Sequence, residues 1–435
     1  MRVTQAVILI SRPWKRILGL SPLERTLLAA SLAGVKDFIL IGDTDAEEAE
    51  ILSPLLKDKR FRDRAIRPDF VPLTRLAELG RTGRIRSRFW LMEDRLVCAP
   101  DILEKAALAE PAPARDVLVV NGAGGGGSDG PFSGVGLCLR ESFARIASVL
   151  AKRGSTGLDA DAIAEIFPPA RTQAIEAGED FCESVKSPEA ARRAGRYLIG
   201  TARKPTDGYF SRNFNRPIST FLTRQLLRLN VTPMEISVVV LAIGLLSGWL
   251  EGRGGYRYAA LGALLFEIAS IVDGCDGENA RLTYRTSKFG GTFDIAGDAA
   301  TFIFFFLNLP IGLYRSSGND LWLALGAVSF LSILLFYAQM TRFTRRTGIG
   351  NNIVAIVKDI EKSSERPGFA GKLDWAASKI APIYRRDFFA TWAFIIIACG
   401  GAGLFMGIIA ILAPVEAVYI YFYSRRRLKE VLAEA

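Results

Sequence analysis

The 435-residue sequence contains no histidine, and this absence removes several familiar kinds of active site. A Ser-His-Asp triad, a Cys-His nucleophile pair and a metal site built on imidazole all require histidine. Acid–base chemistry must therefore be carried by Asp, Glu, Lys or Tyr. Cysteine is also scarce. The five cysteines are scattered and form no Cys-x-x-Cys pair, which argues against a disulfide framework and against a zinc site.

The sequence is basic and strongly apolar. Its net charge is +10, a balance that suits nucleic acid, a membrane surface or anionic substrates. Half of the residues are hydrophobic, and the mean hydropathy of +0.22 is high for a soluble protein of this length. The apolar residues concentrate after about residue 234. We therefore expect a lipid bilayer, and no nucleic acid, as a partner.

Residues 1–195 are predicted to form a cytoplasmic α/β domain. Short apolar runs that read as strands alternate with stretches of helical periodicity, an order that favours a parallel sheet. The predicted strands are 6–10, 37–41, 89–92 and 117–120, and the predicted helices are 23–33 and 45–56. A glycine-rich segment at 122–130 lacks the Lys-Ser/Thr that follows in a P-loop, so we interpret it as a surface loop.

Residues 196–233 form a basic junction. Five apolar side chains recur at nearly helical spacing and leave two arginines on another face: Ile218, Phe221, Leu222, Leu226 and Leu229, against Arg224 and Arg228. This pattern is typical of an amphipathic helix that lies on an anionic membrane surface. A solvated linker helix is the alternative.

Six apolar stretches within residues 234–427 predict an all-α membrane domain with six crossings. Several approach the ~20 residues that a helix needs to span a bilayer. The stretches are 234–250, 257–275, 291–313, 320–340, 388–406 and 408–424. Lys and Arg concentrate in alternate loops, so the positive-inside rule places the soluble domain, both termini and the tail 428–435 in the cytoplasm. The predicted location is the cell (inner) membrane.

Four aspartates lie in or beside the second and third apolar stretches, where charge is least expected. Asp273 and Asp276 are three residues apart, and Asp294 and Asp298 are four apart, so each pair lies on one face of its helix. A short loop joins the two helices, and we expect the pairs to meet at one depth. Ionised carboxylates there are unfavourable unless they are paired or bind metal. Oxygen-rich clusters suit Mg²⁺ or Mn²⁺, and two such ions would grip a diphosphate.

Small residues and an arginine accompany the aspartates. Gly277, Ala280 and Gly290 would let a nucleotide approach the backbone closely, and Arg281 would pair with a phosphate through its planar fork. The alternative is that the aspartates only cap helix ends. Caps favour Asp at a helix N-terminus, whereas Asp273 follows an apolar run, so this alternative fits poorly.

These residues resemble the motif of the CDP-alcohol phosphatidyltransferase family, D-x-x-D-G-x-x-A-R followed by G-x-x-x-D-x-x-x-D. Every specified position is matched within 273–298, and the resemblance covers about residues 205–427. It implies six membrane helices after a surface helix, and two divalent cations, Mg²⁺ or Mn²⁺, held by the four aspartates. An acceptor hydroxyl would attack a CDP-linked donor with Asp298 as general base, and CMP would leave. The residues implied at the CDP are Gly277, Ala280, Arg281 and Gly290.

A narrower likeness extends the resemblance toward the N-terminus. Lys204-Pro-Thr-Asp-Gly-Tyr and Asn215-Arg-Pro-Ile-Ser are similar to segments of fused proteins that join a sugar-nucleotidyltransferase-like domain to this membrane domain. In that subgroup the two parts make an inositol-phosphate nucleotide and then condense it with inositol phosphate. The implied acceptor is a polyol or polyol phosphate, in phospholipid or polyol-phospholipid synthesis. Met234 departs from the Asn usual after Thr-Pro.

The first domain also resembles nucleotidyltransferases. Asp94 falls where that family has a metal-binding Asp, and a glycine-rich loop that wraps the triphosphate should follow Ile10. The segment instead reads Ser-Arg-Pro-Trp-Lys-Arg at 11–16, and proline lacks the backbone N–H that such loops offer to phosphates. We expect a degenerate domain in which Asp94 is a relic metal site. A bifunctional enzyme that also makes the CDP-polyol donor from CTP is the alternative.

A second basic cluster lies near the predicted fourth and fifth helices: Arg342, Arg345, Arg346, Arg385 and Arg386. One interpretation is a pocket for a phosphorylated acceptor, with Arg342 and Arg386 as its contacts. The other is ordinary positive-inside charge. Members of the resembling family often form dimers, so a homodimer is a further expectation.

Overall fold

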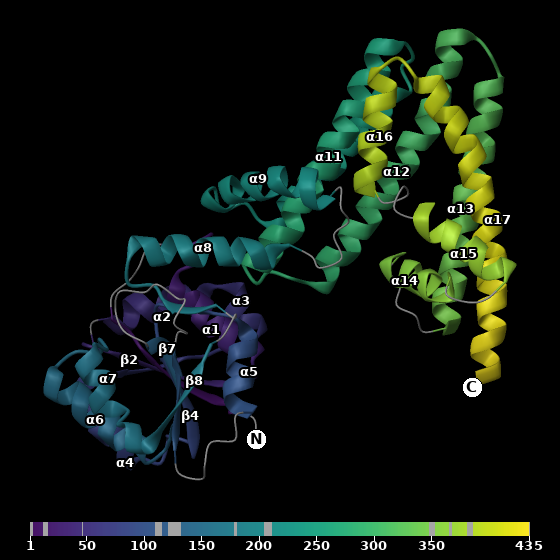
Figure 1. Cartoon of the computed structure of the whole chain (residues 1–435). Helices are drawn as coiled ribbons and strands as arrows, with labels where there is room; N and C mark the ends of the chain where they lie inside the picture. The colour runs from purple at the N-terminus through teal and green to yellow at the C-terminus, as the bar shows by residue number, and fades with distance from the viewer. Residues whose placement is uncertain are drawn as a thin grey trace. The chain divides into compact units, whose positions relative to one another are not determined.

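The chain forms two compact units in the computed structural model (Figure 1). The first comprises Met1–Thr201 together with Leu282–Arg285, and the second comprises Ala202–Arg281 and Thr286–Ala435. Each unit has its own hydrophobic core. The structure describes residues 3–11, 16–45, 47–108, 115–120, 132–177, 181–203, 211–347, 353–364, 368–380 and 386–434.

A seven-stranded sheet forms the centre of the first unit, in the order β3-β2-β1-β4-β7-β6-β8. Its strands are β1 (Gln5–Leu9), β2 (Asp37–Gly42), β3 (Asp69–Pro72), β4 (Arg88–Glu93), β6 (Asp116–Val120), β7 (Phe132–Leu139) and β8 (Thr172–Glu176). The predicted parallel sheet is correct for most pairs and wrong at β7, which runs antiparallel to both β4 and β6. Antiparallel neighbours, unlike parallel ones, need no crossover connection.

Helices cover both faces of this sheet. Alternate residues of β1 enter two different apolar clusters, Ala6 and Ile8 one of them and Val7 and Leu9 the other, as expected for a central strand buried on both faces. The helices are α1 (Pro22–Leu32), α2 (Glu47–Lys57), α3 (Lys59–Asp63), η1 (Leu73–Arg75), α4 (Leu76–Arg81), α5 (Pro100–Leu108), α6 (Ser142–Arg153), α7 (Ala160–Ile166), η2 (Pro169–Arg171) and α8 (Pro188–Ala202). A small sheet pairs β5 (Leu96–Cys98) with β9 (Cys182–Ser184).

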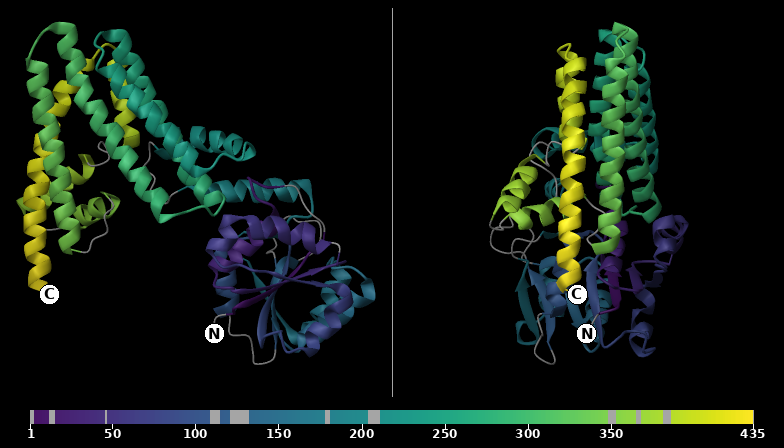
Figure 2. Two further views of the ribbon diagram at one scale, coloured as in Figure 1. Left: turned by 180° about the vertical axis from the view of Figure 1, so that it is seen from behind. Right: turned by 90° about the vertical axis from the view of Figure 1, so that its right-hand side faces the viewer.

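Among its described residues, the regular elements of the second unit are all helices. After a π-helical turn, η3 (Ser211–Asn215), its helices are α9 (Arg216–Arg228), α10 (Pro233–Glu251), α11 (Tyr256–Leu282), α12 (Lys288–Ser317), α13 (Leu321–Thr347), α14 (Ile353–Ser364), α15 (Phe369–Ile380), α16 (Arg386–Ala398) and α17 (Ala402–Glu434). Figure 2 shows α13 and α17, green and yellow, side by side along their length.

The predicted count of six membrane crossings is not exact. In the described part of the chain, five helices are long and apolar enough to cross a bilayer: α10, α11, α12, α13 and α17. A sixth apolar helix, Phe388–Ala398, is shorter. The predicted fifth stretch, 388–406, is interrupted at Cys399-Gly400-Gly401, where Gly400 adopts a positive φ of 84°. A glycine in this left-handed conformation ends a helix, which divides the stretch between α16 and α17.

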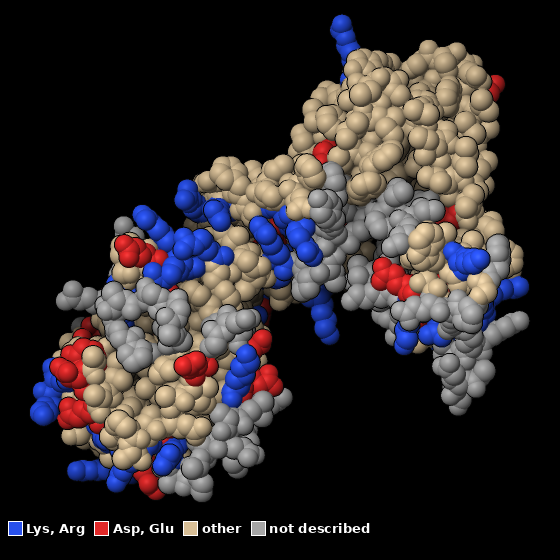
Figure 3. Space-filling model, viewed as in Figure 1, with Lys and Arg blue, Asp and Glu red and all other residues tan. Residues whose placement is uncertain are grey.

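A row of glycines brings α10 and α12 into close contact. A Cβ atom at Gly244 would lie 2.3 Å from Thr301 Cγ2, and one at Gly248 would lie 2.6 Å from Phe304 Cδ1. Small residues spaced by four let the backbones of apolar helices approach each other. The upper part of this unit is almost free of charged side chains in Figure 3, and large apolar side chains stay exposed on α10, α13 and α17. Such a surface suits lipid rather than water.

Candidate metal centre

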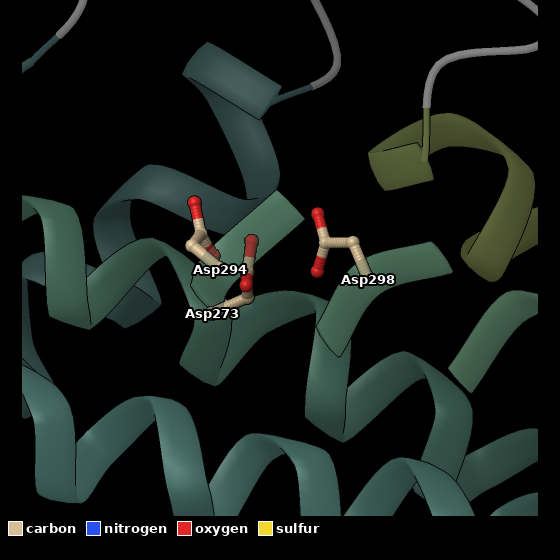
Figure 4. Close-up of side chains that lie close together, drawn as sticks. All are labelled: Asp273, Asp294 and Asp298. Carbon is tan, nitrogen blue, oxygen red and sulfur yellow. The ribbon is translucent and has the colours of Figure 1, made fainter. Parts of the chain in front are cut away.

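Three of the predicted aspartates meet at one point. Asp273 lies on α11, and Asp294 and Asp298 lie one turn apart on α12. One carboxylate oxygen from each lies within 4.8 Å of the others, and all three residues are half-buried. Figure 4 shows the three side chains around a common space. Oxygens bound to one Mg²⁺ at about 2.1 Å lie at most about 4.2 Å apart, so the carboxylates need to move little to share an ion.

Asp276 lies outside this group of three. Its side chain is buried, and its Oδ2 accepts a hydrogen bond of 2.6 Å from Ser237 Oγ on α10. Residues three apart on a helix differ by about 60° in direction, so Asp273 and Asp276 need not reach the same point. The described residues thus bring together three of the four predicted aspartates, and the fourth contacts α10.

A buried glutamate that sequence reasoning missed fixes α9 against the same part of α11. Glu278 is 0% exposed. Its carboxylate accepts hydrogen bonds from Arg216 Nη1 at 2.9 Å, Ser219 Oγ at 2.7 Å and Thr223 Oγ1 at 2.7 Å, all on α9. The signal available in the sequence was the spacing of Arg216, Ser219 and Thr223, which places them on one face of α9. Two apolar residues of α9, Ile218 and Phe221, stay exposed, whereas Leu227 is buried.

The glycine beside Asp273 allows this close approach. A Cβ atom at Gly274 would lie 3.0 Å from Arg216 Nη1 and 3.3 Å from Ser219 Cβ. Any side chain there would push α9 away from α11. The aspartate-bearing turn of α11 is therefore held by α9 through charge and through close packing.

The residues implied at the CDP have local contacts of their own. Arg281 Nε donates to the carbonyl of Ala202 at 2.7 Å, and a Cβ atom at Gly277 would lie 3.1 Å from Arg281 Nη1. Gly277 thus leaves room for the Arg281 guanidinium. Ala280 is half-buried on α11, and the N–H of Gly290 donates to Ser287 Oγ at 2.9 Å, which caps α12. Contact of these residues with a nucleotide stays a prediction.

Arg342, one of the predicted acceptor contacts, lines a pocket of about 160 Å³ at the C-terminal ends of α13 and α17. Arg346 and Arg425 line the same pocket. The next residue along α17, Arg426, is paired with Asp374 of α15, and the residue after it is likewise paired with a carboxylate of α14. No such carboxylate partner is found for the three pocket arginines among the described residues.

Asp94 lies at the C-terminal end of β4 in the first unit and is 5% exposed. Its Oδ1 accepts a hydrogen bond of 3.0 Å from Ser11 Oγ. Burial raises the pKa of Asp94 to about 6, although the Ser11 hydrogen bond and the nearby Arg95 act in the opposite direction. The neighbouring Glu93 pairs with Lys186 at 3.1 Å. Over the described ranges, Asp94 joins no group of three or more potential metal ligands, and its relic metal role stays a prediction.

Several predicted features lie outside the described residues. They are positions 12–15 of the substituted loop, the glycine-rich segment 122–130, the motif at 204–209, Arg385 and the side chain of Arg386.

Comparison with known families finds a match within the helical region. Residues 227–363, from the end of α9 to α14, match the CDP-alcohol phosphatidyltransferase family. All four aspartates lie in this segment. The resemblance predicted from the motif is thereby confirmed. Together with the apolar helices, the match indicates a multi-pass membrane protein.

Three similar proteins share the name bifunctional IPC transferase and DIPP synthase. The protein of Aquifex aeolicus is 33% identical over 177 residues, which is 40% of each chain. That of Thermococcus kodakarensis is 34% identical over 160 residues, 37% of this chain and 35% of the relative. The matched segments therefore span less than half of these two relatives. The Archaeoglobus fulgidus protein is 27% identical over 345 residues, 76% of this chain and 67% of the relative, a match too long for the second unit alone.

Among solved structures, the inositol-1-phosphate CTP transferase from T. maritima aligns with 44% of this chain and 92% of its own. The identity is 14% and the TM-score is 0.29, which is too low to support an argument about function.

Proposed function

We propose that this chain transfers a phosphorylated alcohol from a CDP-linked donor to an acceptor hydroxyl, releasing CMP, because residues 227–363 match a CDP-alcohol phosphatidyltransferase domain. The reaction would serve phospholipid or polyol-phospholipid synthesis. One observation carries the proposal: Asp273, Asp294 and Asp298 converge from two helices inside this domain. The absence of histidine fits this chemistry, which needs carboxylates and metal ions rather than imidazole.

The donor set fits hard divalent cations. Carboxylate oxygens without thiolate or imidazole favour Mg²⁺ or Mn²⁺ over softer metals. We propose two ions, with Asp273, Asp294 and Asp298 as direct ligands and Asp276 completing the set beside Ser237. Bound there, the ions would neutralise the charge that develops on the leaving phosphate.

The protein's own groups then have separate tasks. Asp298 would take the proton of the acceptor hydroxyl, whose oxygen forms a bond to the donor's β-phosphorus. The bond from that phosphorus to the bridging oxygen breaks, and CMP leaves with the electron pair. Arg281, whose guanidinium is positioned by the Ala202 carbonyl and accommodated by Gly277, would pair with the donor phosphates. Ala280 and Gly290 would border the nucleotide.

The basic pocket lined by Arg342, Arg346 and Arg425 supports a phosphorylated acceptor, such as a polyol phosphate. Arginine forks bind phosphate bidentately, and pocket arginines without carboxylate partners keep their charge available. We propose Arg342 as an acceptor contact from this pocket and Arg386 from its sequence position at the start of α16.

We also propose that the first unit and both termini face the cytoplasm of a cell (inner) membrane, from the bias of Lys and Arg among the loops. The exposed apolar side chains Ile218 and Phe221 of α9 support a place for this helix on the lipid surface. A homodimer remains part of the proposal, to be tested by cross-linking in native membranes.

The test supplies the purified full chain with a panel of CDP-diacylglycerol and CDP-polyol donors, labelled polyols and polyol phosphates, and Mg²⁺ or Mn²⁺. We expect one pair to release CMP and give a labelled product. Asp298→Asn should abolish transfer while the protein stays folded and inserted, and Asp320→Asn, at an exposed aspartate of the same unit, should be unaffected. Retained CMP formation in Asp298→Asn would remove Asp298 as the base.

A bifunctional enzyme is the second candidate. The match to the Archaeoglobus relative reaches into the first unit, and that relative is named for two activities. Against this stands the proline in the segment that should wrap a triphosphate. The full chain incubated with CTP, Mg²⁺ and polyol phosphates decides the matter, because pyrophosphate release would establish nucleotidyl transfer. The matched control is Asp94→Asn, which should abolish any such release.

A further inference from the structure

The segment Leu282–Arg285 joins the two aspartate-bearing helices, yet it belongs to the first unit. Leu282 is the last residue of α11, and α12 begins at Lys288. Leu282 and Thr283 are buried, and Tyr284 packs against one apolar cluster of the first unit. The chain thus enters this unit a second time between Asp273 and Asp294.

Three arginines of the first unit hold three successive carbonyls of this segment. Arg25 Nη1 donates to the carbonyl of Leu282 at 3.0 Å. Arg60 Nη1 donates to that of Thr283 at 3.2 Å, and Arg64 Nη2 to that of Tyr284 at 3.0 Å. Hydrogen bonds from charged donors are stronger than neutral ones. We call Arg25, Arg60 and Arg64 the arginine clamp.

The clamp is itself fixed within the first unit. Arg25 Nη2 donates to the carbonyl of Ile17 at 3.0 Å, and Arg60 lies between Asp58 and Glu24, with 3.5 Å to Glu24. Both guanidiniums are buried, so loss of a partner carbonyl would leave a buried N–H without its hydrogen bond.

The ring of Tyr284 adds a further contact. The Arg25 guanidinium lies 5.8 Å from the ring centroid, and Tyr284 adopts a positive φ of 56°. A non-glycine residue in this conformation needs support from its surroundings. The segment is therefore held in one conformation by hydrogen bonds, by a cation–π contact and by burial.

We propose that the arginine clamp positions the metal centre, setting Asp273 of α11 against Asp294 and Asp298 of α12. An α-helix is stiff over a few turns, so fixing Leu282 fixes the direction of Asp273, nine residues earlier. The clamp residues would act as positioning residues, because their hydrogen bonds go to the backbone of the linking segment. The inference rests on the proposed function, and it gives the first unit a role that needs no nucleotide turnover.

The first experiment removes single clamp contacts in the full chain. Arg60→Ala and Arg64→Ala are compared with Arg62→Ala, an exposed arginine of α3 that makes no clamp contact. Mn²⁺ binding is followed by electron paramagnetic resonance, and CMP release gives kcat and the Mn²⁺ activation constant. We expect both clamp variants to weaken Mn²⁺ binding about 10-fold, as loss of supporting groups does at other metal sites. Arg60→Lys should recover part of the loss, and Arg62→Ala should match the wild type.

A second variant separates positioning from folding. Inserting two glycines between Arg285 and Thr286 keeps every clamp hydrogen bond and adds about 7 Å of free chain before α12. Hydrogen exchange in β1 and β4 should stay as in the wild type, while Mn²⁺ binding and kcat fall as in the clamp variants.

The outcomes distinguish the clamp from the transferase proposal. Clamp and insertion variants that bind Mn²⁺ and release CMP like the wild type would overturn the clamp alone. A wild type that binds Mn²⁺ but releases no CMP from any donor, with weakened binding in the variants, would support the clamp and overturn the proposed function. A wild type that binds no Mn²⁺ would overturn both.

Discussion

Replacing Glu278 by Gln should release α9 from α11. The carboxylate is 0% exposed and accepts three hydrogen bonds, one of them from a buried arginine. Removing one partner of a buried ion pair typically costs about 3–5 kcal/mol, because the other charge stays buried. The Gln amide oxygen can still accept from a hydroxyl, so we expect the lower end, about 3 kcal/mol, which is roughly 100-fold in the opening equilibrium of α9.

Hydrogen exchange measures this opening directly. In the full chain in lipid nanodiscs, amides of α9 should exchange roughly 100-fold faster in Glu278→Gln than in the wild type, since 1.4 kcal/mol corresponds to a factor of ten. Amides of α12 should be unchanged. Glu361→Gln, at an exposed glutamate of α14, is the matched control and should have no effect.

A second substitution tests the cause. Arg216→Met in the Glu278→Gln background removes the second charge of the pair and should restore a large part of the protection, so that the two changes are far from additive. Unchanged exchange of α9 in Glu278→Gln would refute the reasoning. So would additive losses in the double variant, because they would show that the two side chains act independently.

Three further predictions concern other parts of the chain. Gly248→Val should lower the free energy of unfolding of the purified protein by about 1–3 kcal/mol, because the new side chain overlaps Phe304. Gly407→Ala, with open space around it, should be neutral. Equal melting temperatures of the two variants would contradict the close contact of α10 and α12. Removal of divalent cations with a chelator should abolish CMP release, and Mn²⁺ should restore it in the wild type but not in Asp273→Asn; activity that persists in chelator would exclude the metal centre. The raised pKa of Asp94, about 6, means that the folded state favours the protonated acid, so this contribution to stability is present below about pH 4 and is lost as pH rises through 6. Between pH 5 and 8, the free energy of opening of β4, measured by hydrogen exchange, should therefore become higher in Asp94→Asn than in the wild type, by up to about 3 kcal/mol. A difference between the two proteins that does not change with pH would rule out the effect of burial on Asp94.

The strands predicted at 6–10, 37–41, 89–92 and 117–120 agree with β1, β2, β4 and β6 within one residue at each end. Each is a short run of apolar residues buried on both faces, a pattern that local sequence carries by itself. The strand β7 was missed because its Phe-Ser-Gly-Val-Gly-Leu-Cys-Leu sequence contains two glycines, which weaken the strand signal. The helices α14 and α15 were missed as well.

The candidate metal centre was predictable in part for a similar reason. Asp294 and Asp298 are one turn apart, so their common direction follows from helix geometry alone. The separation of Asp276 did not follow, because it depends on Ser237 of another helix. The contacts of Glu278 and of the clamp carbonyls could not be predicted either, because their partners lie about 55 to 260 residues away in sequence. Spacing within one helix identifies candidate ligands, whereas their partners depend on tertiary packing.

The glycine row on α10 also restricts how substrates reach the aspartates. With atoms of the two helices in contact at Gly244 and Gly248, a diacylglycerol chain has no room to pass between α10 and α12. If the proposed donor is lipid-linked, it must therefore enter along another flank of α12. Bulky residues placed on that flank would slow a lipid donor while leaving a water-soluble one unhindered.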